Sequence, residues 1–323
     1  MTDHTTPPLL DAPLIVATTA GGEPGTALGL ALLALTRPGL SLVIAADEFT
    51  DHRRARFTRH LLDTLGRDDV QVVPGICRHE DGRYRPPTSR YWTAHRLTPD
   101  HLTVTDRDTY TAVAEVCRAH PATPVGFCNH APLTDLAHLL ALDQGAPNPL
   151  GLASRLTVWQ SGGGLDGSGE RPEPRFAVDL TAARTVLLTA RRMRLVLPAR
   201  TAHLPALEPG SAIHRVLAES DRPWAALLLA HLDQARHATI AARHLADTVT
   251  ASAAAGLGSV DFAPTGFTLA ENGRLIVGPG DFEVPMSTSV NSDAVMDWAL
   301  ATLHGDGADH AGVPVAAMRA MAR

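Results

Sequence analysis

The chain has 323 residues, of which 45% are hydrophobic and 19% are charged, a composition typical of a folded globular protein and unlike a disordered one. Its formal net charge is -6 and it has no long basic run, which argues against nucleic acid or an anionic membrane surface as the main partner. All 28 basic residues are arginine. Schiff-base chemistry on a lysine, and with it pyridoxal phosphate bound in the usual way, is therefore excluded.

The cysteines and the apolar segments narrow the class of protein further. Cys77, Cys117 and Cys128 are odd in number and have no CxxC spacing, which supports neither a disulfide framework nor a four-cysteine zinc site. The N-terminal residues lack a charged start followed by an apolar stretch, and the most apolar segment, residues 27–35, is too short to span a bilayer. We therefore expect a cytoplasmic protein with no membrane partner.

The first half of the chain alternates short apolar runs with helical segments. After a flexible tail over residues 1–12, we expect strands at 13–19, 40–46 and 70–74. Helices are expected between them at 27–35, capped by Thr26, and at 53–65. The same rhythm predicts helices at 110–120, 133–142 and 180–188 and strands at 124–128, 156–160 and 194–197. It indicates an α/β fold with an open, mostly parallel sheet flanked by helices.

The remaining segments complete one expected domain over residues 13–303. Residues 78–108 show no periodicity and are either a flap over a site or a long surface connection. A helical stretch is expected at 224–255, strand and turn at 266–277 and 281–285, and a final helix at 292–303. Residues 304–323 are interpreted as a C-terminal tail.

Several short segments, taken in order, resemble the inosine-uridine nucleoside hydrolase family. They are Leu-Gly-Arg-Asp-Asp-Val-Gln-Val at 65–72, Ala-Pro-Leu-Thr-Asp-Leu-Ala at 131–137, the glycine loop at 161–163, Val-Asp-Leu-Thr-Ala-Ala at 178–183, and Asp-x-x-x-Ala at 247–251. The resemblance covers residues 13–303. It implies a site at the carboxyl ends of the strands and hydrolysis of the N-glycosidic bond of a ribonucleoside with the help of Ca²⁺.

The calcium motif that the resemblance implies is largely missing. The family carries Asp-Thr-Asp-Pro-Gly-x-Asp-Asp after its first strand, whereas residues 21–28 read Gly-Gly-Glu-Pro-Gly-Thr-Ala-Leu. Only Glu23 keeps a carboxylate there. The family's carbonyl ligand falls near His130 and its distal carboxylate ligand matches Asp247. Since calcium takes six to eight oxygens, we expect that calcium is lost and that no metal or other cofactor is bound.

Other family positions are partly kept and partly replaced: Glu173 and Asp247 survive, whereas Glu48 and Arg175 are new charges. The ribose-binding Gly-Asn appears as Asp47-Glu48, Glu-Phe-Asn appears as Glu173-Pro174-Arg175, and His-Asp appears as Ala246-Asp247. Glu23, Glu48, Glu173 and Arg175, together with Asn129 at a predicted strand end, are the candidate substrate-binding residues. The candidate catalytic residues are Asp247 as anion or base, with His244 or His130 as acid. The alternative is that Asp247 and Glu173 are structural and that Glu48 pairs with Arg175 to close an empty pocket.

Some features have a structural interpretation beside a functional one. The loop at 21–26 offers main-chain amides for an anion or simply makes a turn. Cys128 and His130 form a nucleophile and base, or pack in the core. His231, His237 and His244 are more typical of surface or core positions than of a zinc site. Arg53, Arg54, Arg56 and Arg59 are expected on a solvated helix face.

We expect a divergent enzyme that acts on a nucleoside or a related small glycoside or metabolite without calcium, in a biosynthetic pathway for example. The alternative is a catalytically silent homologue that binds a ligand or a partner protein. Resemblance alone predicts a homo-oligomer, either a dimer or a tetramer.

Overall fold

Six parallel strands form the larger part of the sheet in the computed structural model, which describes residues 11–47, 49, 51–76, 92–94, 96–104, 107–165, 174–237 and 245–305. The strands are β1 (Leu14–Thr18), β2 (Leu40–Ala45), β3 (Gln71–Pro74), β4 (Val125–Asn129), β5 (Leu156–Ser161) and β6 (Met193–Val196). They are short apolar runs, and β1 is buried along its whole length, as in a parallel sheet with both faces covered. The expected open, mostly parallel α/β sheet is confirmed.

The order of the strands creates a switch point between β1 and β4. Among the described residues the order is β3-β2-β1-β4-β5-β6-β9-β7-β8. From β1 the chain passes through α1 (Pro24–Thr36) to β2 on one side, and from β4 it passes through α4 (Thr134–Gly145) and α5 (Leu152–Arg155) to β5 on the other. Connections that diverge in this way leave a crevice at the carboxyl ends of the strands, where α/β sheets bind ligands.

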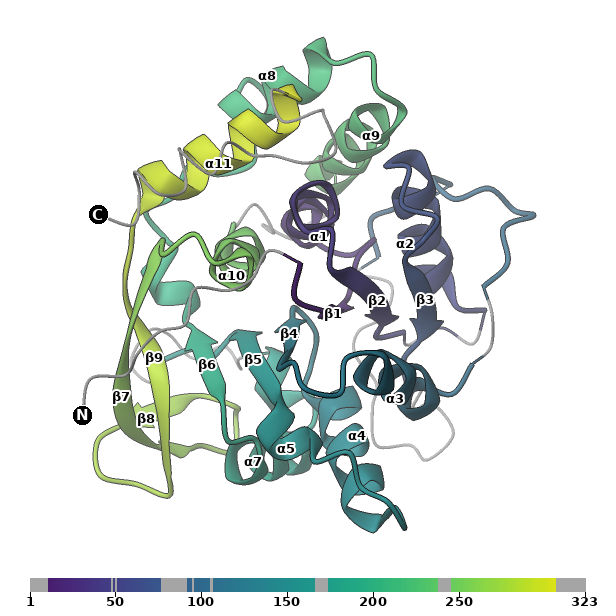
Figure 1. The fold of residues 1–323 in the computed structure, drawn as a ribbon. Coiled ribbons are helices and arrows are strands. Elements are labelled where there is room, and N and C mark those ends of the chain that lie inside the picture. The colour runs from purple at the N-terminus through teal and green to yellow at the C-terminus, as the bar shows by residue number, and fades with distance from the viewer. Residues whose placement is uncertain are drawn as a thin grey trace.

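Helices cover both faces of the sheet and bury a hydrophobic core on each (Figure 1). One layer contains α1, α2 (Arg53–Thr64), α8 (Ala212–Glu219), α9 (Pro223–His237), α10 (Ala246–Ala255) and α11 (Ser292–His304). The other contains α3 (Thr109–Ala119), α4, α5 and α7 (Leu180–Thr189). None of the helices in the described ranges is long and apolar enough to cross a bilayer.

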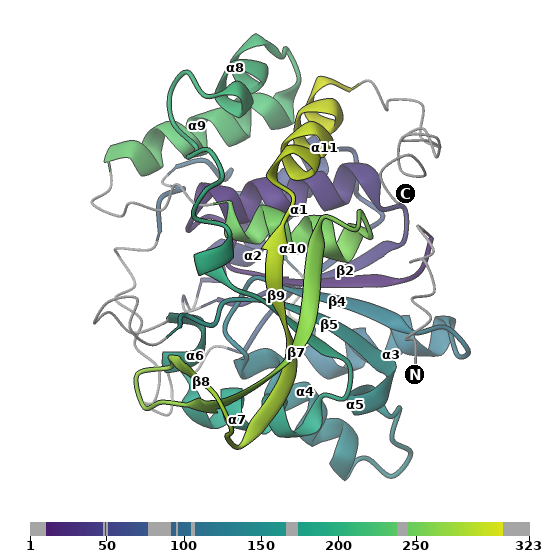
Figure 2. The same ribbon diagram turned by 90° about the vertical axis from the view of Figure 1, so that its left-hand side faces the viewer.

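The C-terminal strands add an antiparallel corner to the sheet. β9 (Phe282–Val290) joins β6 in parallel, and β7 (Val260–Leu269) and β8 (Leu275–Val277) continue the sheet in antiparallel orientation (Figure 2). β7 thus begins well before the expected residue 266, and β9 extends beyond the expected residue 285. Pro264 and Gly266 interrupt the apolar pattern of β7, which is why the sequence alone indicates no strand there.

Two helices also differ from the expectation. The stretch 224–255 is not one helix, because α9 ends at His237 and Leu245 is the non-helical N-cap of α10; residues 238–244 lie outside the described residues. α1 begins at Pro24, so Thr26 lies inside its first turn instead of capping it. Proline suits the first position of a helix because the amide it lacks has no partner there.

Candidate functional site

Asp247 lies at the switch point, in the first turn of α10, and is only 2% exposed. α10 packs across α1 at Gly29, where a Cβ atom would lie 3.1 Å from the main-chain oxygen of Asp247. The missing side chain of Gly29 therefore allows the two helices to approach closely. This packing brings the carboxylate of Asp247 to the ends of β4 and β5.

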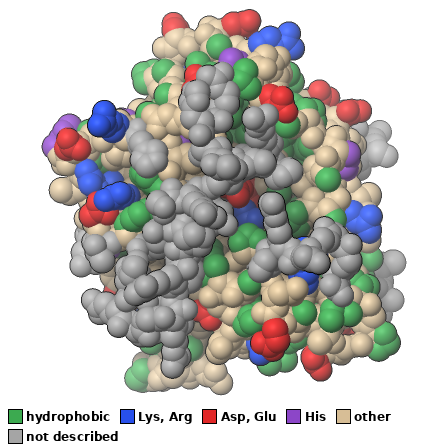
Figure 3. Space-filling view, turned by 180° about the vertical axis from the view of Figure 1, so that it is seen from behind, with side chains coloured by type: hydrophobic (Ala, Val, Ile, Leu, Met, Phe, Trp, Pro, Cys, Tyr) green, Lys and Arg blue, Asp and Glu red, His purple; other side chains and the backbone are tan. Residues whose placement is uncertain are grey.

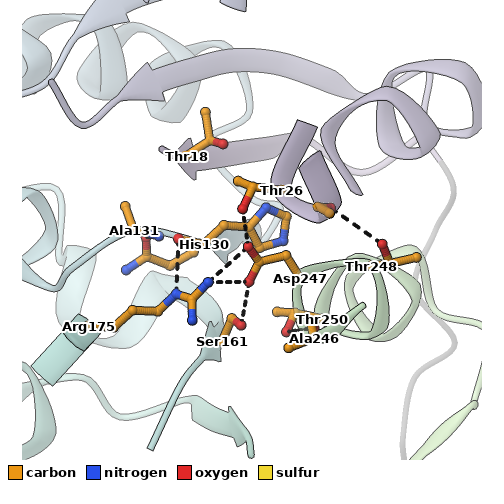
Figure 4. Close-up of polar contacts among 12 residues, drawn as sticks. Thr18, Thr26, His130, Ala131, Ser161, Arg175, Ala246, Asp247, Thr248 and Thr250 are labelled. Atoms are coloured by element: carbon orange, nitrogen blue, oxygen red, sulfur yellow. Dashed lines mark hydrogen bonds and ion pairs between the residues drawn. The ribbon is translucent and has the colours of Figure 1, made fainter. Parts of the chain in front are cut away.

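Three side chains donate hydrogen bonds to that carboxylate (Figure 4). Ser161 Oγ, at the end of β5, lies 2.6 Å from Asp247 Oδ1, and Thr26 Oγ1 donates to Oδ2. Arg175 Nη2, in the short helix α6 (Pro174–Ala177), lies 2.8 Å from Oδ1 and 2.9 Å from Oδ2. We call Thr26, Ser161, Arg175 and Asp247 the ion-pair cluster. Each oxygen of the carboxylate accepts two hydrogen bonds within it.

The ion-pair cluster keeps the Asp247 carboxylate ionised although it is buried. Burial alone raises the pKa of this carboxyl, but the positive charge of Arg175 and the hydrogen bonds from Ser161 and Thr26 outweigh it, so the pKa is lowered overall. The first turn of a helix also favours a negative charge. The side chain of Arg175 is 14% exposed, so the pair is largely shielded from water.

Arg175 also contacts the residue that follows β4. Its Nε donates to the carbonyl oxygen of His130 at 3.2 Å. The side chain of His130 is completely buried, and burial is the main cause that lowers its pKa. Its Nε2 lies 3.2 Å from Cys128 Sγ, and its Nδ1 has no hydrogen-bond partner among the described residues.

Cys128 is buried as completely as His130. Burial, reinforced by the charge of Asp247, raises the pKa of the thiol well above its usual value. A nucleophilic cysteine needs a thiolate, which an electropositive and partly exposed surrounding favours. Cys128 and His130 are therefore brought together as predicted, but as a neutral buried pair.

The side chain of Asn129 forms hydrogen bonds that link the ends of β4 and β5. Its Nδ2 donates to Gln160 Oε1 at 2.7 Å, and its Oδ1 accepts from the amide of Ala131 at 3.0 Å. Gln160 in turn donates to the carbonyl oxygen of Ser161 at 2.6 Å. These contacts fix the strand ends on which the ion-pair cluster is built.

A second set of contacts covers the loop between β1 and α1. Residues 92–94, which we call the strap, lie on this loop: the amide of Thr93 donates to the carbonyl oxygen of Gly21 at 2.9 Å, and Thr93 Oγ1 donates to that of Gly22 at 2.5 Å. Gly21 has a φ of +87°, and a Cβ atom there would lie 2.4 Å from the ring of Trp92. The strap thus requires glycine at position 21.

Arg54, from α2, holds the start of the same loop. Its Nη1 lies 2.7 Å from the carbonyl oxygen of Thr19 and 3.4 Å from that of Ala20, and its guanidinium lies 5.7 Å from the centre of the Trp92 ring. Arg54 is 2% exposed. The expectation that it lies on a solvated helix face is therefore wrong, because the loop carbonyls and Trp92 draw the guanidinium inward.

His231, from α9, contacts both the strap and the loop. Its Nε2 lies 2.9 Å from Thr93 Oγ1 and 3.2 Å from the carbonyl oxygen of Gly22. Burial lowers the pKa of His231 to about 4, so the ring is neutral at physiological pH. Arg54 and the strap hydrogen-bond to all four carbonyl groups of residues 19–22, and His231 adds a second contact to that of Gly22.

These contacts do not fit calcium. The ion needs six to eight oxygens, but the oxygens of Asp247 accept from the ion-pair cluster, and the carbonyl oxygens of residues 19–22 accept from Arg54, the strap and His231. Within the described ranges, no three His, Cys, Asp or Glu side chains gather closely enough to hold a metal ion. The guanidinium would also repel a divalent cation placed beside it.

The structure brings together three of the predicted site residues, Asp247, Arg175 and His130. Glu23 is the partly buried N-cap of α1. Glu48, Glu173 and His244 lie outside the described residues. Because Leu245 is the N-cap of α10, this helix does not extend back to His244 as expected.

Sequence reasoning missed Ser161 and Thr26 in the ion-pair cluster, and Trp92, Thr93 and His231 around the loop. Ser161 carries a usable signal, since a polar residue at the end of a buried strand and before two glycines belongs at the carboxyl edge of the sheet. Figure 3 views the molecule from the side where the parallel strands end, and a recess there has acidic and basic side chains at its floor.

No protein-family model and no curated protein sequence matches the chain. Several solved structures, in contrast, are similar to this chain. The inosine-uridine preferring nucleoside hydrolase from Bacillus anthracis is 16% identical, with a TM-score of 0.71 over 90% of this chain and 99% of that one. The plant nucleoside hydrolase PpNRh1 is 17% identical, with a TM-score of 0.69 over 91% of this chain and 99% of that one.

A third similar structure is the type III effector protein XopQ complexed with adenosine diphosphate ribose. It is 17% identical, with a TM-score of 0.64 over 92% of this chain and 95% of that one. The chain therefore has the nucleoside hydrolase-like α/β fold. At these identities the likeness shows the fold alone.

Proposed function

We propose that this chain binds a nucleoside or a related small glycoside at the carboxyl ends of its parallel strands, and that it does so without calcium. The observation that carries this proposal is the engagement of Asp247, whose two oxygens accept four hydrogen bonds from Thr26, Ser161 and Arg175. A carboxylate bonded in this way has no oxygen directed at a metal ion or at an attacking water.

The class of ligand rests on the fold and its neighbours. Two of the similar structures are nucleoside hydrolases, and the effector protein is complexed with adenosine diphosphate ribose. The shared chemistry is a ribosyl group attached to a base or a phosphate. The crevice at the switch point is the place where a sheet of this topology accepts such a molecule.

A second candidate is an enzyme that uses the same pocket for different chemistry. It is favoured by the ionisable residues Glu48, Glu173 and His244 at or beside positions that the resemblance assigns to ribose or base contacts. Such an enzyme needs a different acid or base. Both oxygens of Asp247 already accept two hydrogen bonds each, and the side chain of His130 is completely buried.

The two candidates separate in one experiment. Inosine, uridine and adenosine diphosphate ribose are each added to the full chain with a chelator or with calcium chloride, and both thermal stabilisation and release of the base are measured. Binding predicts stabilisation that calcium does not change and no release of base. Release in the presence of the chelator supports the enzyme. Release that depends on calcium overturns both.

A further inference from the structure

The guanidinium of Arg175 contacts two of the positions at which the resemblance implies calcium ligands, the carboxylate of Asp247 and the carbonyl group of His130. Its Nη2 lies 2.8 Å and 2.9 Å from the two oxygens of Asp247, and its Nε lies 3.2 Å from the carbonyl oxygen of His130. One cation therefore joins the carboxylate and the carbonyl, which come from α10 and from the end of β4. Figure 4 shows the guanidinium between them.

We propose that Arg175 is the built-in cation of this site, balancing the charge of Asp247 and bridging the strand ends without a metal ion. The proposal rests on the proposed function, since it explains how the site stays ordered without calcium. Arg175 is a positioning residue in this account. It acts through Asp247 and His130.

The chemistry of a guanidinium group suits the role of a cation beside Asp247. A guanidinium is always charged, is weakly hydrated for a cation, and presents N–H donors in a fixed plane that matches a carboxylate. The hydroxyls of Thr26 and Ser161 supply further donors to the same anion. A buried ion pair is tolerated when additional hydrogen bonds use its remaining donors and acceptors. Removing one partner destabilises the fold, because the other charge stays buried without compensation.

The short helix that carries Arg175 is also fixed from its other side. Gly273, in the turn between β7 and β8, packs against Ala177 so closely that a Cβ atom at position 273 would lie 2.4 Å from the amide nitrogen of Ala177. α6 is thus held between this turn and the ion-pair cluster. Loss of the side chain at position 175 should leave a cavity beside the negatively charged Asp247. A free guanidinium ion has the size to fill this cavity and the charge to balance the carboxylate.

The first test is chemical rescue of the full chain carrying Arg175→Ala, followed by thermal unfolding. We expect its Tm to fall by roughly 5–10 °C, and guanidinium or methylguanidinium at millimolar concentration to recover about half of that loss. Sodium chloride at the same concentration should recover none of it. Arg184→Ala is the matched control, because Arg184 makes an exposed pair with Glu271 at 2.8 Å. Its Tm should change by less than about 2 °C and should not respond to guanidinium.

A second comparison holds even if the alanine variant does not fold. Lysine and methionine have similar length, but only lysine carries a charge. Arg175→Lys should unfold several degrees above Arg175→Met, because an ammonium still balances Asp247. Equal or reversed stability of these two variants, or an alanine variant that guanidinium does not stabilise, overturns the built-in cation. Neither result depends on a ligand, so the proposed function stands or falls separately on its own binding assay.

Discussion

The ion-pair cluster and the loop covered by the strap lie at the same edge of the sheet. Buried oxygen atoms accept hydrogen bonds in both regions, but from different kinds of donor. The cluster holds one buried carboxylate with a guanidinium and two hydroxyls. The strap and its neighbours hold four neutral carbonyl groups, with Trp92 packed on Gly21. The comparison teaches that one region should respond to charge, whereas the other should respond to shape and to protonation of His231.

The largest expected effect concerns the charge of the cluster. Asp247→Asn keeps the shape of the side chain but removes the negative charge that Arg175 contacts. We expect the free energy of unfolding, measured with urea, to fall by about 3–5 kcal/mol. Asp261→Asn is the control, since Asp261 is exposed and its carboxylate accepts a hydrogen bond from Ser289, and it should change stability by less than about 1 kcal/mol. A loss for Asp247→Asn no larger than that of the control would show that the cluster is not a charge-dependent unit.

The next effect concerns the shape of the strap. Gly21→Ala introduces a methyl group into the ring of Trp92 at a φ of +87°, and should lower stability by roughly 3 kcal/mol. Gly66→Ala is matched, because Gly66 has a φ of +71° and nothing within 4 Å of the added atom. It should lose only roughly 1–2 kcal/mol, and the difference between the variants measures the contact with Trp92. If the two variants lose the same amount in urea unfolding, the strap does not lie on Gly21.

A smaller effect separates the hydroxyl groups of the cluster from its charge. Thr26→Val keeps the volume but removes one donor to Asp247 Oδ2, which still accepts from Arg175. We expect a loss of about 2 kcal/mol in the free energy of unfolding. Thr185→Val is a suitable control, because Thr185 is only partly buried and its hydroxyl donates to the carbonyl oxygen of Thr181 in its own helix. A loss equal to the control would mean that Thr26 does not support the carboxylate.

The smallest effect is the pH dependence of the strap region. The pKa of His231 is lowered to about 4 in the folded chain, whereas an unfolded chain takes up the proton near pH 6.5. The contribution of His231 is therefore complete above pH 6.5 and is lost as the pH falls towards 4. On going from pH 7 to pH 5.5, this effect should lower the free energy of unfolding by about 1 kcal/mol.

The measurement for this effect is the difference between the wild-type chain and His231→Gln in urea unfolding at both pH values. His101→Gln, at an exposed position, controls for the general acid response of the protein. The wild-type chain should lose more stability than His231→Gln on acidification. A parallel response of the two would place His231 outside the buried contact with Thr93.

The fold was more accessible from the sequence than the site. β1, β2 and β4 are short, buried and largely apolar segments, so their pattern identifies them. The pattern fails for β7, where Pro264 pairs with Pro285 across the antiparallel corner and neither residue is typical of a strand. Such pairing depends on a partner far along the chain, which local periodicity does not report.

The site shows the same limit. Asp247 and Arg175 are each identifiable as candidates, but their pairing joins residues 72 positions apart and is set by the packing of α6 and α10 on the strand ends. Thr26 resembles a helix cap and Arg54 a surface residue until the fold turns each towards a buried acceptor. The strap has no periodicity at all, so nothing in its own sequence predicts the loop that it covers.

Calorimetric titration of the wild-type chain with calcium chloride tests the central claim most directly, because the account rests on the guanidinium of Arg175 standing beside Asp247. We predict no saturable heat of binding up to millimolar calcium, and no change in Tm when a chelator replaces the ion. Tight, stoichiometric binding that Asp247→Asn abolishes would contradict the account, since the carboxylate would then be exchanging its arginine for a metal.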